Sequence, residues 1–212
     1  MRIGGYQPCS LCDYDGYIAA VVFTQGCNYR CPYCHNGSLL ALTVPSEQLI
    51  PVANVLTHLK QRSGQIDAVV ISGGEPTLQQ DLPDFLRTLK DMGLMIKVDT
   101  NGSRPHVLSS LLSMGVVDYV AMDIKAPWSS YHHVAGLPIS IVRTQQSIEV
   151  IRKSGIPHEF RTTLVPGLLT EEDISAIQSI VPKGSLYRTQ PFRPLLVSSN
   201  ENTSSMRNFV GD

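Results

Sequence analysis

A short apolar strand followed by a helix recurs five or six times along this chain, and this alternation limits the possible folds most strongly. The predicted strands are residues 18–23, 68–71, 94–98, 119–122, 158–164 and 185–189. The predicted helices are residues 46–59, 81–92, 104–114, 141–153 and 171–180. Because regular alternation of this kind builds a parallel sheet with helices outside it, the sequence predicts an α/β fold.

Polar or glycine-rich residues follow nearly every predicted strand, and they separate the two architectures that fit the alternation. A doubly wound sheet concentrates its site at the point where the strand order reverses. A (β/α) barrel brings the loops from all its strands to one site at the C-terminal face. The chain has 212 residues, fewer than the roughly 250 of an eight-unit barrel. We therefore predict an open partial (β/α)6 barrel.

Three parts of the chain differ in composition. Residues 1–17 hold turn residues at both ends and are expected to form a short hairpin or an irregular lead-in. Residues 18–195 carry the alternation and are predicted to form the barrel. Residues 196–212 are rich in Ser, Asn and Thr, so we expect a mobile tail. Cys9 and Cys12 of the lead-in are interpreted as free thiols or an adventitious metal clip, since a redox motif would need a following helix.

Three cysteines occupy the loop that leaves the strand of residues 18–23. Cys27, Cys31 and Cys34 are spaced C-x3-C-x2-C. Three thiolates this close together suit one metal centre. A four-iron cluster held by three cysteines keeps one iron free of protein ligands, and that iron can bind a substrate or cofactor. The alternatives are a structural zinc site with His35 as the fourth ligand, or a chance cluster of inert thiols.

A glycine-rich turn ends the next predicted strand. Gly73 and Gly74 allow the backbone to approach a ligand closely, and Glu75 offers an acceptor to an ammonium group. Together with C-x3-C-x2-C and the aromatic Tyr33 before its last cysteine, the turn resembles the G-G-E-P motif of the radical S-adenosylmethionine (SAM) family. The resemblance implies a partial (β/α) barrel, a [4Fe–4S] cluster on the three cysteines, and SAM held through its amino group.

The later strand ends carry further candidate site residues. The segment Asp99-Thr100-Asn101-Gly102 is either a turn with Asx hydrogen bonding or, by resemblance, the D-T-N-G segment that lines the SAM site. Asp123 and Lys125 share one face of an extended strand. They form an ion pair or, by resemblance, the D-x-K element of glycyl-radical activating enzymes, which the resemblance places near SAM and the target peptide. Arg161 on the fifth strand could pair with a carboxylate.

Within the radical SAM family, the sequence is similar to anaerobic ribonucleoside-triphosphate reductase activating proteins. The similarity includes residues 3–5, 13–16 and 21–36; Asp15 departs from it, because that family commonly has proline there. The resemblance implies reductive cleavage of SAM and formation of a glycyl radical on a partner enzyme. Activators of pyruvate formate-lyase share most of these motifs. The implied partners are a glycyl-radical enzyme, most simply the anaerobic ribonucleotide reductase, and a flavodoxin- or ferredoxin-like electron donor.

Two other classes of function stay open at this point. One is a radical SAM enzyme that acts on a small molecule. The other is an iron–sulfur electron carrier or a zinc-binding module, although a carrier has no use for a glycine-rich amine clamp. If the substrate is a peptide, it must enter from outside. The predicted loop of residues 126–139, with Trp128, Tyr131, His132 and His133, is then the candidate partner surface.

The charge balance and the cysteine count limit the binding partners and the cellular compartment that we expect. The formal net charge is −1, so we expect neither nucleic-acid nor membrane-surface binding. The longest apolar runs, such as residues 18–23, are far shorter than the ~20 residues that span a bilayer. Five cysteines, three of them in one loop, favour a reducing compartment. With no secretory leader expected, we predict a cytoplasmic protein.

Overall fold

Seven strands form one sheet in a computed structural model that describes residues 1–193. Their order across the sheet is the same as their order in the chain. The strands are β1 (Ile3–Ser10), β2 (Ala19–Thr24), β3 (Ala68–Gly73), β4 (Met95–Thr100), β5 (Tyr119–Asp123), β6 (His158–Leu164) and β7 (Leu186–Pro191). Strands β2 to β7 pair in parallel, while β1 pairs antiparallel with β2.

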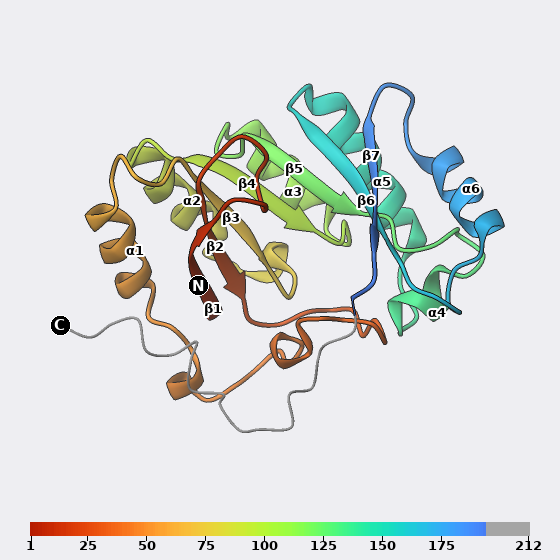
Figure 1. Cartoon of the computed structure of the whole chain (residues 1–212), viewed down its shortest axis with the longest axis horizontal. Coiled ribbons are helices and arrows are strands. Elements are labelled where there is room, and N and C mark those ends of the chain that lie inside the picture. The colour runs from red at the N-terminus through yellow and green to blue at the C-terminus, as the bar shows by residue number, and fades with distance from the viewer. Residues whose placement is uncertain (194–212) are drawn as a thin grey trace.

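The helices lie outside the curved sheet (Figure 1). They are α1 (Val52–Gln61), α2 (Leu82–Asp91), α3 (Pro105–Ser113), α4 (Tyr131–Ala135), α5 (Ile141–Ser154) and α6 (Glu171–Ile180). Because the strand order never reverses, successive right-handed crossovers place these helices on one face of the sheet. A doubly wound sheet needs a reversal. The predicted open partial (β/α)6 barrel is confirmed.

Strands β2 to β5 are buried on both faces over most of their length, as their largely apolar sequences require, whereas β7 is mostly exposed. One face packs against the helices, with Val22, Ile71 and Val98 in the main hydrophobic cluster. The opposite face lines the inside of the curve. There Val21 and Val70 belong to a second, smaller cluster. Side chains on one strand alternate between these two clusters with the period of two that a β-strand imposes.

The lead-in forms part of the sheet. Instead of making a hairpin within itself, it supplies β1, which pairs along β2. After β1 the chain turns so that Tyr14, which is 6% exposed, packs in the inner cluster at the base of the barrel. Lys97 of β4 reaches the same place and donates a hydrogen bond to the carbonyl oxygen of Asp13 (2.8 Å). Residues 13–14 thus close the end of the barrel where the parallel strands begin.

The first helix begins later than the sequence predicted. Residues 46–48 form a single 3-10 turn, η2 (Ser46–Gln48), and α1 starts only at Val52. The cause is Pro51, because the residue before a proline is driven out of the helical region. Ile50 is extended there and its N–H donates to the carbonyl of Ile3 (2.8 Å). The segment before Pro51 therefore joins β1 in place of extending the helix.

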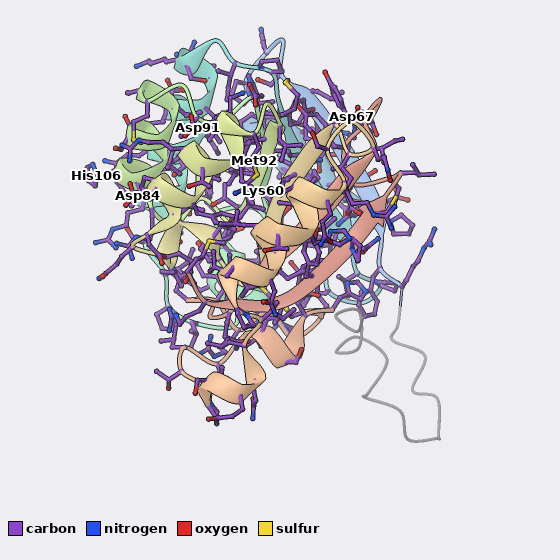
Figure 2. The ribbon with its side chains drawn as sticks, turned by 90° about the vertical axis from the view of Figure 1, so that its left-hand side faces the viewer. Lys60, Asp67, Asp84, Asp91, Met92 and His106 are labelled. Carbon is purple, nitrogen blue, oxygen red and sulfur yellow. The ribbon has the colours of Figure 1, made fainter. Side chains whose placement is uncertain are left out.

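A hollow lies at the base of the strands, on the side seen in Figure 2. Its lining includes Lys60 near the end of α1, Met92 just after α2, and Asp67 just before β3. It lies near the N-terminal ends of the parallel strands, opposite the polar C-terminal strand ends. No helix within residues 1–193 has the length and apolar character needed to cross a membrane.

Candidate active site

The predicted site residues converge on one pocket at the C-terminal ends of the parallel strands. Those that line it are Cys27, Cys31, Tyr33, Cys34, Gly73, Gly74, Asp99, Thr100, Asn101, Asp123, Lys125 and Arg161. They come from the loop after β2, from the ends of β3, β4 and β5 with the residues that directly follow them, and from the middle of β6. Since parallel strands all end at the same edge, residues far apart in the sequence meet here. Glu75 does not line this pocket.

The cysteine loop is held in place by backbone hydrogen bonds at its start and near its middle. The N–H of Gly26 donates to Leu39 (2.8 Å) and that of Arg30 donates to Ala135 at the end of α4 (2.9 Å). Cys27 is the most buried of the three cysteines, with 7% of its surface exposed, while Cys31 and Cys34 are half-buried. Burial raises the pKa of the Cys27 thiol to about 11, although the backbone N–H of Tyr29, which points at its sulfur, acts to lower this pKa.

Residues 126–139, the predicted partner surface, contain α4 and support the site from behind. Tyr131 is fully buried, and its hydroxyl donates to the carbonyl of Asp123 (3.4 Å) and accepts from the N–H of Lys125 (3.3 Å). The ring of Trp128 stacks on Tyr131 with centroids 5.4 Å apart. His132 and His133 are exposed. The expectation of an outward-facing segment was therefore wrong for Tyr131, because its ring fills the core and its hydroxyl holds the end of β5.

The glycine-rich turn lies directly against the cysteine loop. The N–H groups of Gly74 and Glu75 donate to the carbonyls of Thr24 (2.9 Å) and Gly26 (2.8 Å). A Cβ at position 74 would overlap the carbonyl of Gly26, so glycine permits this approach. Gly73 and Gly74 line the pocket, and the close approach that glycine permits at position 74 is to the cysteine loop itself.

The side chain of Glu75 points elsewhere than expected. It is fully buried, and its carboxylate accepts four hydrogen bonds, from both the N–H and the hydroxyl of Thr77, from the hydroxyl of Thr100 (2.7 Å) and from the N–H of Asn101 (2.7 Å). These four donors favour the ionised form and act to lower the pKa of Glu75, but burial outweighs them and raises it. Its oxygens are thus occupied by the protein. The structure does not present Glu75 to an ammonium group, and Glu75 instead joins the turns after β3 and β4.

Four charged side chains form a network on the inner face of β4, β5 and β6. Arg161 lies between two carboxylates, 3.4 Å from Asp99 and 3.2 Å from Asp123, and Lys125 lies 3.2 Å from Asp123. Burial alone would raise the pKa of Asp123, but Lys125 and Arg161 outweigh it and hold that pKa below its usual range. Burial likewise opposes the charged form of Lys125, and Asp123 reverses this, so the pKa of Lys125 is raised. The network keeps two cations in the pocket wall.

Asp99 has capacity to bind a further donor. Its Oδ2 accepts from Ser72 (3.1 Å), whereas its Oδ1 is buried without a hydrogen-bond partner among the described residues. Burial raises the pKa of Asp99 more than Arg161 lowers it. An unsatisfied buried acceptor is costly. Its position on the pocket wall suits a ligand that carries N–H or O–H groups.

These residues fit an iron–sulfur cluster and SAM. Three thiols on one pocket wall are the soft ligands that iron–sulfur clusters use. Lys125 and Arg161 are suited to a carboxylate, and Asp99 to a donor. Within residues 1–193, no three His, Cys, Asp or Glu side chains are placed so that they could hold a single metal ion.

Several lining residues were missed by the sequence interpretation. They are Tyr29, Asn36, Leu40, Ser72, Thr163 and Gln190. Thr163 lies two residues after Arg161 on β6, so the alternation of a strand could have identified it. Gln190 at the end of β7 carries no comparable motif. His35 also lines the pocket, and its Nε2 hydrogen-bonds to the carbonyl oxygen of Arg193 (2.5 Å). The end of β7 and the cysteine loop therefore meet (Figure 1).

The fold and the site together define a partial-barrel enzyme with three cysteines at its catalytic face. The family model "Radical SAM superfamily" matches residues 21–179, three quarters of the chain, and the protein belongs to this family. It is a radical SAM enzyme, and the cofactors of the family are a [4Fe–4S] cluster and SAM, as the resemblance implied.

Two of the relatives are described as activating enzymes. A Methanocaldococcus jannaschii protein described as "Putative glycyl-radical enzyme activating enzyme" is 35% identical over 91% of this chain and 80% of its own length. The Escherichia coli pyruvate formate-lyase 1-activating enzyme is 30% identical over 81% of this chain and 71% of its own length. Among solved structures, Streptococcus suis SuiB bound to SAM has a TM-score of 0.63 at 14% identity. The match covers 82% of this chain but only 40% of SuiB, and it supports the fold alone.

Proposed function

We propose that the protein activates a glycyl-radical enzyme by removing a hydrogen atom from a glycine Cα of that partner. The observation that carries the proposal is the single pocket that joins the three cysteines to the charged network of Asp99, Asp123, Lys125 and Arg161. The similarity to two activating enzymes, each over more than two thirds of its length, supports the same class of substrate.

Each part of the pocket has a defined task in this reaction. Cys27, Cys31 and Cys34 would each hold one iron of the cluster. The ammonium of Lys125 and the guanidinium of Arg161 would bind the carboxylate of SAM. Asp99 Oδ1 and the glycine-rich backbone at Gly73 would accept from its amino group or ribose hydroxyls. A cluster held there would supply the single electron needed to cleave SAM into methionine and a 5′-deoxyadenosyl radical. The buried walls exclude water from that radical.

The preferred partner is the anaerobic ribonucleoside-triphosphate reductase. The motifs at residues 3–5, 13–16 and 21–36 favour it, while the E. coli relative favours pyruvate formate-lyase. A small-molecule substrate is a third candidate. We propose a flavodoxin- or ferredoxin-like protein as the electron donor, and the cytoplasm as the compartment, because the cysteines require reducing conditions.

The test uses the reconstituted, reduced protein with SAM under strict exclusion of oxygen. It is mixed in turn with an anaerobic ribonucleotide reductase and with a pyruvate formate-lyase, and electron paramagnetic resonance spectra are recorded. We expect a glycine-centred doublet on the reductase and a weaker signal or none on the lyase. The reverse preference would identify the lyase as partner. Formation of 5′-deoxyadenosine without a protein radical on either would contradict the proposal.

A further inference from the structure

Asn101 is directed at the sulfur of Cys27. Its side-chain nitrogen lies 3.9 Å from Cys27 Sγ, a separation at which an N–H group can donate to the large sulfur atom. The same nitrogen lies 3.0 Å from Oδ1 of Asn28. A primary amide carries two N–H donors, so both contacts can be made together. The residue is 6% exposed, so the surrounding protein shields these hydrogens from most of the solvent.

The orientation of this amide is fixed by a neighbour that can only donate. The backbone N–H of Ser103 lies 2.9 Å from Oδ1 of Asn101. Because a backbone N–H never accepts, the atom facing it must be the amide oxygen, which excludes a flipped assignment. The nitrogen is therefore the atom that faces Cys27. Asn28 strengthens this arrangement, since its own nitrogen donates to the hydroxyl of Ser103 (2.9 Å).

The backbone of Asn101 is held equally firmly. Its N–H donates to the buried carboxylate of Glu75 (2.7 Å), and the next N–H, that of Gly102, donates to the hydroxyl of Thr100 (3.1 Å). Thus Glu75, which does not line the pocket, fixes the turn that aims Asn101 at the cysteine. Together with the N–H of Tyr29 (3.3 Å), this gives the Cys27 sulfur two donors.

We infer that Asn101 is a positioning residue that raises the reduction potential of the cluster through its N–H contact with Cys27. Reduction adds negative charge to the cluster and its sulfur ligands, and burial of Cys27 opposes that charge. N–H dipoles aimed at the sulfur stabilise the reduced form more than the oxidised form. The inference concerns the cluster of the family and does not depend on which partner is activated.

The experiment is an anaerobic redox titration of the reconstituted protein without SAM or partner, followed by electron paramagnetic resonance of the reduced cluster. Asn101→Ala should make the potential more negative. At the midpoint potential of the wild-type protein, we expect the ratio of reduced to oxidised cluster to fall about tenfold, equivalent to about 59 mV for one electron. Ser103→Ala is the matched control, because it removes a hydroxyl of the same network but keeps the backbone N–H that orients Asn101. Its potential should equal that of the wild type.

An unchanged potential in Asn101→Ala, or an equal shift in both variants, would overturn the inference. If Asn101→Ala assembles no cluster, the wild-type protein labelled with 15N in its asparagine side chains decides the matter. Pulsed electron paramagnetic resonance of the reduced cluster should show a weak 15N coupling that is retained in Asn36→Ser, whose amide contacts Gly73 instead. Absence of the coupling, or its loss in Asn36→Ser, would likewise overturn the inference.

Discussion

Cys27 illustrates how burial changes the reactivity of a thiol. Free cysteine titrates near 8.5, and only its thiolate is a good nucleophile. In the protein without its cluster, burial raises the pKa of Cys27 to about 11. The thiol is therefore protonated at neutral pH and turns into thiolate only as the pH approaches that value. Cluster assembly must remove this proton.

We therefore expect Cys27 of the cluster-free protein to react slowly with iodoacetamide at pH 8. Its rate should increase about tenfold per pH unit until the pH nears 11, since the thiolate fraction grows in that proportion. Cys9 and Cys12, which are exposed, serve as internal references. Mass spectrometry of the alkylated peptides measures all of these rates in one sample. A Cys27 rate at pH 8 equal to the rates of Cys9 and Cys12 would contradict the prediction.

For single residues, the sequence predicted which residues lie at the site better than it predicted where their side chains point. The sequence predicted a glycine-rich turn at the end of its strand, and Gly73 and Gly74 lie there and line the pocket, because strand ends and glycines are visible in sequence. The direction of the Glu75 side chain depends on donors from Thr77, Thr100 and Asn101, the last two of which lie at the end of β4 and just after it. Such convergence is set by tertiary packing and has no local signal. Asn101 is the same case, since its neighbour Cys27 lies 74 residues away.

Among the elements, the short helix α4 has the clearest consequence for the site. It ends at Ala135, whose carbonyl accepts from the N–H of Arg30 in the cysteine loop, and the next residue, Gly136, has a φ of +74°. A Cβ on Gly136 would overlap the carbonyl of Arg30. The cysteine loop is thus packed against a glycine that cannot be enlarged without moving it.

Gly136→Ala should therefore impair both stability and cluster binding. Gly155 is the matched control, because it also follows a helix with a φ of +74° but has open space around its Cα. Both substitutions cost about 1–2 kcal/mol for the left-handed backbone, and Gly136→Ala should lose a further ~1–3 kcal/mol through overpacking. Denaturant unfolding and iron counts after reconstitution measure the two effects. Equal losses in both variants would show that the contact with Arg30 is unimportant.

Element boundaries depended on signals that compete locally. Periodic apolar residues after Ser46 favoured a helix, yet Pro51 and the bridge between Ile50 and Ile3 delayed it to Val52. In residues 126–139 the opposite happened, because tertiary burial of Tyr131 stabilises a helix of five residues that is too short to show a period. By contrast, α2 was predicted within one residue at each end, since four buried apolar side chains mark its inner face.

At the scale of the whole molecule, charged residues also connect the lead-in to the barrel. Lys97 is 6% exposed and bridges the carbonyl of Asp13 and the carboxylate of Glu159 (3.2 Å). Arg188 of β7 pairs with the same carboxylate (3.0 Å) and with Asp15. Residues 13–15 are therefore joined to β4, β6 and β7 at once. Whether residue 17 bounds a separate unit stays a prediction, and residues 196–212, the predicted tail, lie outside the described residues.

Lys97→Met should lower the free energy of unfolding of the cluster-free protein by about 3 kcal/mol, because removing one partner leaves the buried Glu159 carboxylate with less compensation. Lys60→Met on the exposed face of α1 (Figure 2) is the control and should change it by less than about 0.5 kcal/mol. Chemical denaturation measures both. A loss no greater for Lys97 than for Lys60 would mean that the lead-in is held by its apolar contacts alone.

The strand order has a further consequence for what the protein can take in. Strands β1 and β7 stand at opposite ends of that order, and for the part of the chain that the structure describes no pairing joins them. A closed ring admits a long polymer only if a free end is threaded through it. Here the two ends of the sheet are joined by side-chain contacts such as Arg188 with Asp15 and His35 with the carbonyl of Arg193. Contacts of this kind impose no threading requirement, because they can break and form again while the backbone stays intact.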